Sequence, residues 1–178
     1  MANCILQWNI RGVISNYTEL NLLVKTHDPS IICLQETKLP EKSNNFTIKN
    51  FTPYNHINKN NLIACGGSSI FIKNSILHNE IPLSTNLQAV AIRATLHKPI
   101  TICSLYLPPD STPSLRDIQN LTQQLPSPFL MIGDFNAHNP LWGSTSRLPK
   151  GKIIEDLLFQ SDLCFLNDGS PTHIQYDP

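Results

Sequence analysis

The chain has 178 residues, of which 40% are hydrophobic, and its 13 basic and 13 acidic side chains give a formal net charge of zero. This length suits one domain with a substantial core. The balanced charge argues against a disordered chain and against a broadly basic nucleic-acid-binding surface, but it leaves room for a local basic patch. No apolar run is long enough to span a bilayer and no secretory signal opens the sequence, so we expect an intracellular protein that has no membrane partner.

Hydrophobic periodicity predicts the elements of the first half of the chain. Apolar residues at helical spacing predict a helix at residues 16–27, which Pro29 ends. Residues 41–61 are rich in Asn and Lys and predict mostly loop, with an edge strand near residues 46–51. Short apolar runs predict the strands of this half at residues 4–10, 31–34 and 68–73.

The second half alternates strands with two helices. A helix is expected at residues 114–125, where Ser114 and Asp117 resemble a capping box, and another at residues 152–161. Apolar runs predict strands at residues 89–96, 100–107, 129–132 and 163–166, the first two forming a hairpin. Strands outnumber helices, and a strand–helix–strand unit precedes the hairpin. We therefore predict an α/β domain of two packed sheets with the helices outside, spanning residues 1–178.

The stretch LMIGDFNAHNPLWG places two polar side chains next to a buried strand. Side chains on an extended chain alternate between faces, so Asp134 and Asn136 should point one way and Phe135 the other. Three further strands also end in polar residues that chemistry can use, namely Asn9, Glu36 and Tyr106. Taken singly, each of these residues has an ordinary explanation as a turn, surface or rim residue. Their joint occurrence at strand ends favours a functional site.

This set of side chains suits phosphodiester hydrolysis. Mg²⁺ prefers oxygen ligands and takes one or two carboxylates, so Glu36 suits a ligand role with Asn9 beside it. A second carboxylate, Asp134, is placed to orient or deprotonate the attacking water. Asn136 and Tyr106 can donate hydrogen bonds to the charge that develops on phosphate oxygens.

The motifs WNIRG, LQET, LYLPP and GDFNAHNPLWGS, in this order, resemble those of the endonuclease/exonuclease/phosphatase family. GDFNAH followed by PLWGS is most similar to the endonuclease domain of jockey-like non-LTR retrotransposon polyproteins. The resemblance implies a four-layered α/β/β/α sandwich of the DNase I type, a Mg²⁺ cofactor that Mn²⁺ can replace, and DNA as partner, with no obligate protein partner. It implies a nuclear location for a protein that acts on genomic DNA.

The family roles apply only to the positions that match its motifs. Asn9 and Glu36 match the metal-site residues, and Tyr106 matches the tyrosine near the scissile phosphate. Asp134 and Asn136 match the pair that handles the attacking water and the phosphate. Residues outside these roles are candidates for phosphate or DNA contacts in loop-like segments, or else they form an ordinary solvated surface. They are Arg11, His138, Arg147, Lys150 and Lys152.

The family pattern continues with a further aspartate and a Ser-Asp-His motif, which the 178 residues do not contain. The resemblance therefore implies a domain without its final strands, roughly 50 residues, and negligible nicking by these residues alone. Three functions stay open: a DNA endonuclease domain of a retrotransposon, a phosphoesterase acting on a small or lipid phosphate, and a catalytically inactive remnant. PLWGS and the basic residues after it favour DNA, whereas the missing motif favours the remnant.

Overall fold

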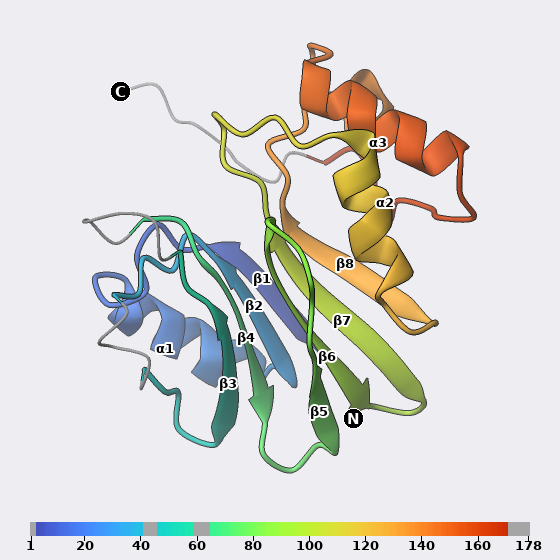
Figure 1. Cartoon of the computed structure of the whole chain (residues 1–178). Coiled ribbons are helices and arrows are strands. Elements are labelled where there is room, and N and C mark those ends of the chain that lie inside the picture. Colours follow the sequence, from blue (N-terminus) through green and yellow to red (C-terminus); the bar gives the residue numbers. More distant parts are fainter. Residues whose placement is uncertain (1–2, 41–45, 59–64, 171–178) are drawn as a thin grey trace.

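The computed structural model describes residues 3–40, 46–58 and 65–170. Two four-stranded sheets pack face to face, with one helix on the outside of the first sheet and two on the outside of the second (Figure 1). This arrangement confirms the predicted sandwich with external helices. No helix of the described part is long and apolar enough to cross a membrane.

The first sheet has the strand order β1-β2-β4-β3, in which β1 and β2 run parallel and the other pairs run antiparallel. The second sheet has the order β5-β6-β7-β8, in which only β7 and β8 run parallel. The strands of the first sheet are β1 (Ile5–Asn9), β2 (Ile31–Gln35), β3 (Phe51–His56) and β4 (Ser68–Lys73). Those of the second are β5 (His78–Ile81), β6 (Gln88–Thr95), β7 (Pro99–Tyr106) and β8 (Phe129–Asp134).

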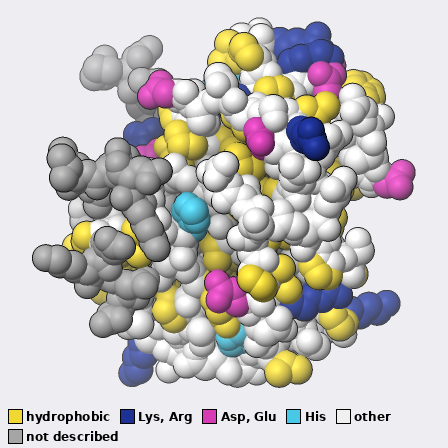
Figure 2. Space-filling model, in the orientation of Figure 1, with side chains coloured by type: hydrophobic (Ala, Val, Ile, Leu, Met, Phe, Trp, Pro, Cys, Tyr) yellow, Lys and Arg dark blue, Asp and Glu magenta, His cyan; other side chains and the backbone are white. Residues whose placement is uncertain are grey.

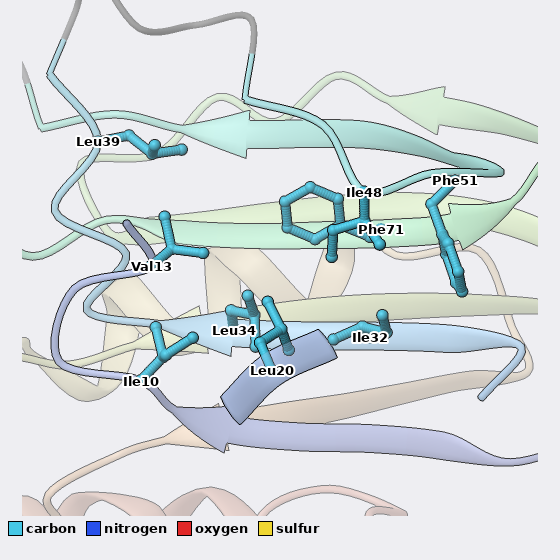
Figure 3. Close-up of a cluster of buried hydrophobic side chains, with 9 residues drawn as sticks. All are labelled: Ile10, Val13, Leu20, Ile32, Leu34, Leu39, Ile48, Phe51 and Phe71. Atoms are coloured by element: carbon cyan, nitrogen blue, oxygen red, sulfur yellow. The ribbon is translucent and has the colours of Figure 1, made fainter. Parts of the chain in front are cut away.

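The helices are α1 (Tyr17–His27), α2 (Leu115–Gln123) and α3 (Pro149–Phe159). Leu20 of α1 packs on the outer face of the first sheet against Ile32, Leu34 and Phe71, as Figure 3 shows. On the other side of the molecule, α2 and α3 cover the outer face of the second sheet. The Ser114–Asp117 capping box at the start of α2 is present, which confirms its prediction from sequence.

A third apolar cluster fills the space between the two sheets. Strand alternation creates it, because every second residue of an inner strand faces the opposite sheet. Ile31 and Cys33 of β2 meet Val90 and Ile92 of β6 in this layer, while the intervening side chains of β2 face α1. The inner strands are therefore buried on both faces, as their nearly continuous apolar sequences indicate.

Several predicted boundaries are wrong. The edge strand expected near residues 46–51 lies instead at Phe51–His56, where it accommodates Pro53 at the sheet edge. The strand β5 was not predicted, since two of its four side chains are exposed polar groups. Residues 163–166 form no strand, and Leu166 is largely exposed. The last helix begins at Pro149 rather than residue 152, since proline is favoured in the first turn of a helix.

Candidate active site

The layer between the sheets changes from apolar to polar toward one end of the sandwich. Residues 31 and 33 of β2 lie in the apolar layer, and Gln35 follows them on the same face. In β7, Ile102 is succeeded in the same way by Ser104 and then by Tyr106. In β8, Ile132 is succeeded by Asp134, the register partner of Tyr106. The predicted site residues thus lie where the inter-sheet core ends.

The Asn9 side chain joins the carboxylates of the two sheets. Its Nδ2 donates to Glu36 Oε1 over 2.9 Å and to Asp134 Oδ2 over 2.6 Å. Asn9 ends β1 and Glu36 follows the neighbouring strand β2 of the first sheet, whereas Asp134 ends β8 of the second. Asn9 is therefore within hydrogen-bonding distance of two carboxylates that were predicted as site residues from separate motifs.

Glu36 adopts a left-handed backbone conformation with φ +50°, which is rare for a residue with a side chain. Hydrogen bonds on both sides hold this turn. Gly12 N donates to Glu36 O over 2.7 Å, and Lys38 N donates to Gly66 O over 2.9 Å. Such strain persists where the surroundings over-determine it, as they often do at active sites.

The Glu36 side chain is kept ionised by its donors. Burial alone would raise its pKa, but hydrogen bonds from Asn9 and Tyr106 and the nearby Lys38 ammonium outweigh this effect and hold the pKa of Glu36 below its usual range. Lys38 Nζ lies 3.5 Å from Glu36 Oε2, and about 20% of the Glu36 side chain is exposed. A carboxylate thus faces solvent at the edge of the site.

Tyr106 lies beneath the two carboxylates with only 5% of its surface exposed. Burial raises its pKa well above the ordinary value, and the charges of Glu36 and Asp134 raise it further. Its hydroxyl therefore remains a proton donor at every physiological pH, and it donates to Glu36.

The GDFN turn holds Asp134 by its backbone. Asn136 has φ +45°, so its backbone is not extended. The strand alternation that predicted a shared direction for Asp134 and Asn136 therefore ends before Asn136. Instead, its backbone N–H donates to Asp134 Oδ1 over 3.1 Å and its Nδ2 donates to Leu107 O over 3.0 Å. Phe135 points away, into the core beneath α2 and α3, as predicted. At Gly133, a Cβ atom would collide with the Leu105 backbone, which explains the glycine of the motif.

Sequence reasoning missed the polar residues beneath the site. Gln35, Ser68 and Ser104 are fully buried and hydrogen-bonded across the two sheets. The available signal was a polar residue inside each apolar run, in IICLQ and TICSLY. A buried polar group requires a partner, so such residues indicate a network even when its members are distant in sequence.

The basic candidates differ in their surroundings. On the face that Figure 2 shows, Lys and Arg side chains stand in separate small groups. Arg147 is paired with Glu155, and Lys152 Nζ lies 2.5 Å from Asp156 Oδ1. Arg11 and His138 are exposed, and the backbone N–H of Arg11 donates to Asn9 Oδ1 over 3.3 Å.

Lys150 was expected in a loop, and this placement is wrong. It lies in the first turn of α3 and is 8% exposed. Its Nζ donates to the carbonyl oxygens of Pro108 over 2.5 Å and Pro109 over 2.9 Å. Lys150 thus ties α3 to the segment that follows Tyr106, which leaves little of its ammonium for an external phosphate.

The site's ligand chemistry fits a hard cation bound by few protein groups. Within the described ranges, no group of three or more His, Cys, Asp or Glu side chains could enclose a metal ion. Glu36 offers a carboxylate, and Asn9 has an amide oxygen that accepts from the Arg11 backbone N–H while its Nδ2 faces Glu36. Mg²⁺ accepts such a sparse set, because it keeps several waters and is bound through one or two carboxylates plus substrate phosphate.

The fold is a DNase I-like α/β sandwich. The structure is similar to the endonuclease domain of TRAS1, a telomere-specific non-LTR retrotransposon, with a TM-score of 0.75 and 23% identity over 93% of this chain and 75% of that domain. It is also similar to the APE2 catalytic domain of Xenopus laevis, with a TM-score of 0.63 and 17% identity over 85% of this chain and 66% of that one.

Sequence comparison finds similar proteins among retrotransposon polyproteins. Residues 100–178 match the family model described as endonuclease-reverse transcriptase. The chain is 27% identical over 175 residues to the RNA-directed DNA polymerase from mobile element jockey of Drosophila melanogaster. It is 29% identical to the probable RNA-directed DNA polymerase from transposon X-element of the same species. These matches cover 96% and 97% of this chain but 19% of each relative, so the chain spans about a fifth of their length. The predicted resemblance to jockey-like endonuclease domains is confirmed.

Proposed function

We propose that this chain is the endonuclease domain of a non-LTR retrotransposon polyprotein and nicks DNA with the help of Mg²⁺, which Mn²⁺ can replace. The observation that carries the proposal is the double hydrogen bond of Asn9 to Glu36 and Asp134, which unites residues of both sheets at one edge of the sandwich. The similarity to the jockey and X-element polyproteins supports the retrotransposon setting. Genomic DNA in the nucleus is the target that we propose.

Glu36 and Asn9 are the groups that would hold the ion. Glu36 is suited to this role because its pKa is lowered and part of its carboxylate faces solvent. When bound, a divalent ion supplies positive charge that stabilises the charge developing on the phosphate oxygens. The left-handed turn at Glu36 fixes the carboxylate before any ligand arrives, so little ordering remains to be done on binding.

The second sheet supplies the groups that act on water and phosphate. Asp134 is the base that accepts the proton of the attacking water. Asn136 orients Asp134 through its backbone N–H and keeps one side-chain N–H for phosphate. Tyr106 donates a hydrogen bond to Glu36 and stays protonated throughout, so it holds a proton at the site without titrating.

DNA backbone contacts fall to exposed basic residues around the site. Arg11 is next but one to Asn9, and His138 follows the GDFN turn. Arg147 and Lys152 already pair with acidic residues of α3, so phosphate would have to compete with Glu155 and Asp156. We therefore place the main phosphate contacts at Arg11 and His138 and secondary ones at Arg147 and Lys152.

Calorimetric titration with Mn²⁺ tests the metal site without requiring turnover. We expect one ion per chain, with affinity lowered at least tenfold by Glu36→Gln. Glu19→Gln is the matched control, because Glu19 is an exposed carboxylate on α1 outside the site. No binding, or equal binding by both variants, would overturn the proposed metal site.

A second assay separates DNA from other phosphate substrates. Supercoiled plasmid and bis(p-nitrophenyl) phosphate are incubated with Mg²⁺ and either the wild-type chain or the Asp134→Asn variant. Any cutting of plasmid should require both Mg²⁺ and Asp134. Cleavage of the small diester with intact plasmid supports the phosphoesterase alternative. Metal binding with neither reaction identifies a catalytically inactive domain.

A further inference from the structure

The two halves of the site stand on different sheets, so their geometry depends on how the sheets are aligned. Asn9 and Glu36 belong to the first sheet, whereas Tyr106 and Asp134 belong to the second. Apolar contacts alone specify such an alignment weakly, because dispersion and hydrophobic forces have little directionality. A directional contact between the sheets is needed close to the site.

A buried polar bridge supplies this contact directly beneath the site residues. Gln35 Nε2 donates to Ser104 Oγ over 3.0 Å. The Ser104 and Ser68 hydroxyls are 2.7 Å apart, and Ser68 Oγ also donates to Ser104 O over 3.1 Å. On the other side, Gln7 Nε2 donates to Gln35 Oε1 over 2.6 Å, which fixes the Gln35 amide. Ser104 is thus held by two strands of the opposite sheet.

Two of the three bridge residues are close in sequence to a site residue. Gln35 precedes Glu36 and is the register partner of Asn9, while Ser104 lies two residues before Tyr106 on the same face of β7. A shift between the sheets that broke the Gln35–Ser104 hydrogen bond would therefore move Glu36 relative to Tyr106. Because all three bridge side chains are fully buried, water cannot replace the lost partner.

We infer that Gln35, Ser68 and Ser104 are positioning residues, which align the two sheets so that Asn9 reaches Glu36 and Asp134 together. This inference deepens the proposed function. Only the expected effect on metal binding and catalysis rests on that function. The alignment itself is a property of the folded chain. It predicts that loss of the bridge alters the Asn9 hydrogen bonds even when the fold survives.

The Ser104→Ala variant tests the bridge, and β4 provides a matched control. Ser69 is also fully buried, but its hydroxyl has no hydrogen-bond partner among the described residues, and it faces away from the second sheet. Ser69→Ala therefore removes the same atom from an equally buried position next to Ser68 without touching the bridge. Should Ser104→Ala fail to fold, Gln35→Met, which keeps a similar volume, takes its place.

The readout is the side-chain amide of Asn9, followed by nuclear magnetic resonance in ¹⁵N-labelled protein. We expect its resonances to shift and exchange faster with water in Ser104→Ala or Gln35→Met and to stay in place in Ser69→Ala. Mn²⁺ affinity should fall about tenfold with the bridge variants, the usual scale for losing a group that supports a metal ligand.

The two proposals fail separately in this experiment. Asn9 resonances that are the same in Ser104→Ala, Ser69→Ala and wild type would overturn the positioning role, whatever the metal affinity. A wild-type chain that binds no Mn²⁺ would overturn the proposed metal site, while the Asn9 resonances would still decide whether the bridge aligns the sheets.

Discussion

Glu36 and Asp134 reach the same Asn9 side chain from opposite sheets, and they are held in different ways. Glu36 follows β2, an inner strand that pairs with β1 and β4 and is buried along its whole length. Asp134 ends β8, which pairs only with β7 among the described strands and is half-buried throughout. The first carboxylate is thus attached to the most enclosed part of the sandwich and the second to a less enclosed one.

The difference in support matches the difference in proposed role. A residue that holds a metal must present its oxygen at a fixed place, and Glu36 is fixed by a strained turn with hydrogen bonds on both sides. A carboxylate that accepts a proton from water loses its charge, so its hydrogen bonds must be able to rearrange during the reaction. Asp134 is held by one backbone N–H and one amide donor, a looser arrangement. The following changes test this contrast.

Phe135→Ala should have the largest effect, because it removes the packing that holds the GDFN turn. The ring contacts the core beneath α2 and α3 but is only half-buried, so we expect a loss of about 3 kcal/mol in the free energy of unfolding. Urea denaturation measures this loss. Metal affinity should stay unchanged, since Glu36 is supported by the other sheet. An equal loss of metal affinity would show that the two supports are not independent.

In a chain extended through the Ser-Asp-His motif, where nicking is expected, Asp134→Asn should lower the rate of DNA nicking by about 100-fold or more, the usual scale for a general base. The amide keeps the shape of the side chain and a partner for Asn9, so the fold should persist. DNA affinity should hold or rise slightly, because one negative charge near phosphate is gone. Nicking rates and fluorescence anisotropy with labelled duplex measure the two quantities. A weakened affinity with an unchanged rate would contradict the assigned role.

Glu36→Gln should act through the metal instead and lower the Mg²⁺ affinity by about tenfold or more, since losing even a group that supports a metal ligand costs that much. In the same extended chain, raising the Mg²⁺ concentration should restore part of the nicking rate in this variant and none in Asp134→Asn. The comparison is made by titrating both variants with Mg²⁺ under identical conditions. If added Mg²⁺ rescues Asp134→Asn and not Glu36→Gln, the two roles are reversed.

The pH dependence of stability should also show whether the hydrogen bonds and charges around Glu36 stabilise the fold. The folded pKa of Glu36 lies below its unfolded value, so the carboxylate stabilises the fold at neutral pH. This stabilisation begins to fade below the unfolded pKa, about 4.3, and is lost as the pH falls through the folded pKa. Thermal melts between pH 7 and acid should therefore show a shallower acid decline in Glu36→Gln than in wild type. Parallel declines would mean that Glu36 has no net stabilising partners.

Sequence could predict the regular parts of the fold because they follow local rules. The capping box at Ser114 and the alternation that points Phe135 into the core depend on neighbouring residues alone. The strand β5 could not be found this way, since His78–Ile81 owes its conformation to pairing with β6. Residues 163–166 have the composition of a strand but no pairing strand within the described chain.

In the candidate site, too, some residues could be predicted from local sequence and others could not. The chemistry-bearing residues Asn9, Glu36 and Asp134 were recognisable because they interrupt apolar runs and match family motifs. Their supports were not recognisable, because the left-handed turn at Glu36 is fixed by Gly66, thirty residues away in the sequence. The ion pair of Lys38 with Glu36 was missed for a simpler reason, since an exposed lysine gives no local signal.

Lys38 provides the smallest expected effect and the finest test of the comparison. Its side chain is 41% exposed and its Nζ lies 3.5 Å from Glu36 Oε2, so Lys38→Met should change the free energy of unfolding by less than about 1 kcal/mol. The same charge opposes a cation at Glu36, and its removal should strengthen Mg²⁺ binding by about threefold in low salt. This gain should disappear at high ionic strength, where exposed charges are screened.

The matched control is Lys73→Met, because Lys73 also pairs with an acidic residue, Asp28, but at the opposite end of the first sheet. Titrating all three proteins with Mg²⁺ at two salt concentrations measures the difference. A stronger Mg²⁺ affinity in Lys38→Met alone, lost at high salt, means that the ion binds next to Glu36. If Lys38→Met and Lys73→Met behave alike, the ion lies elsewhere, and the assignment of a fixed metal-holding carboxylate to the first sheet is wrong.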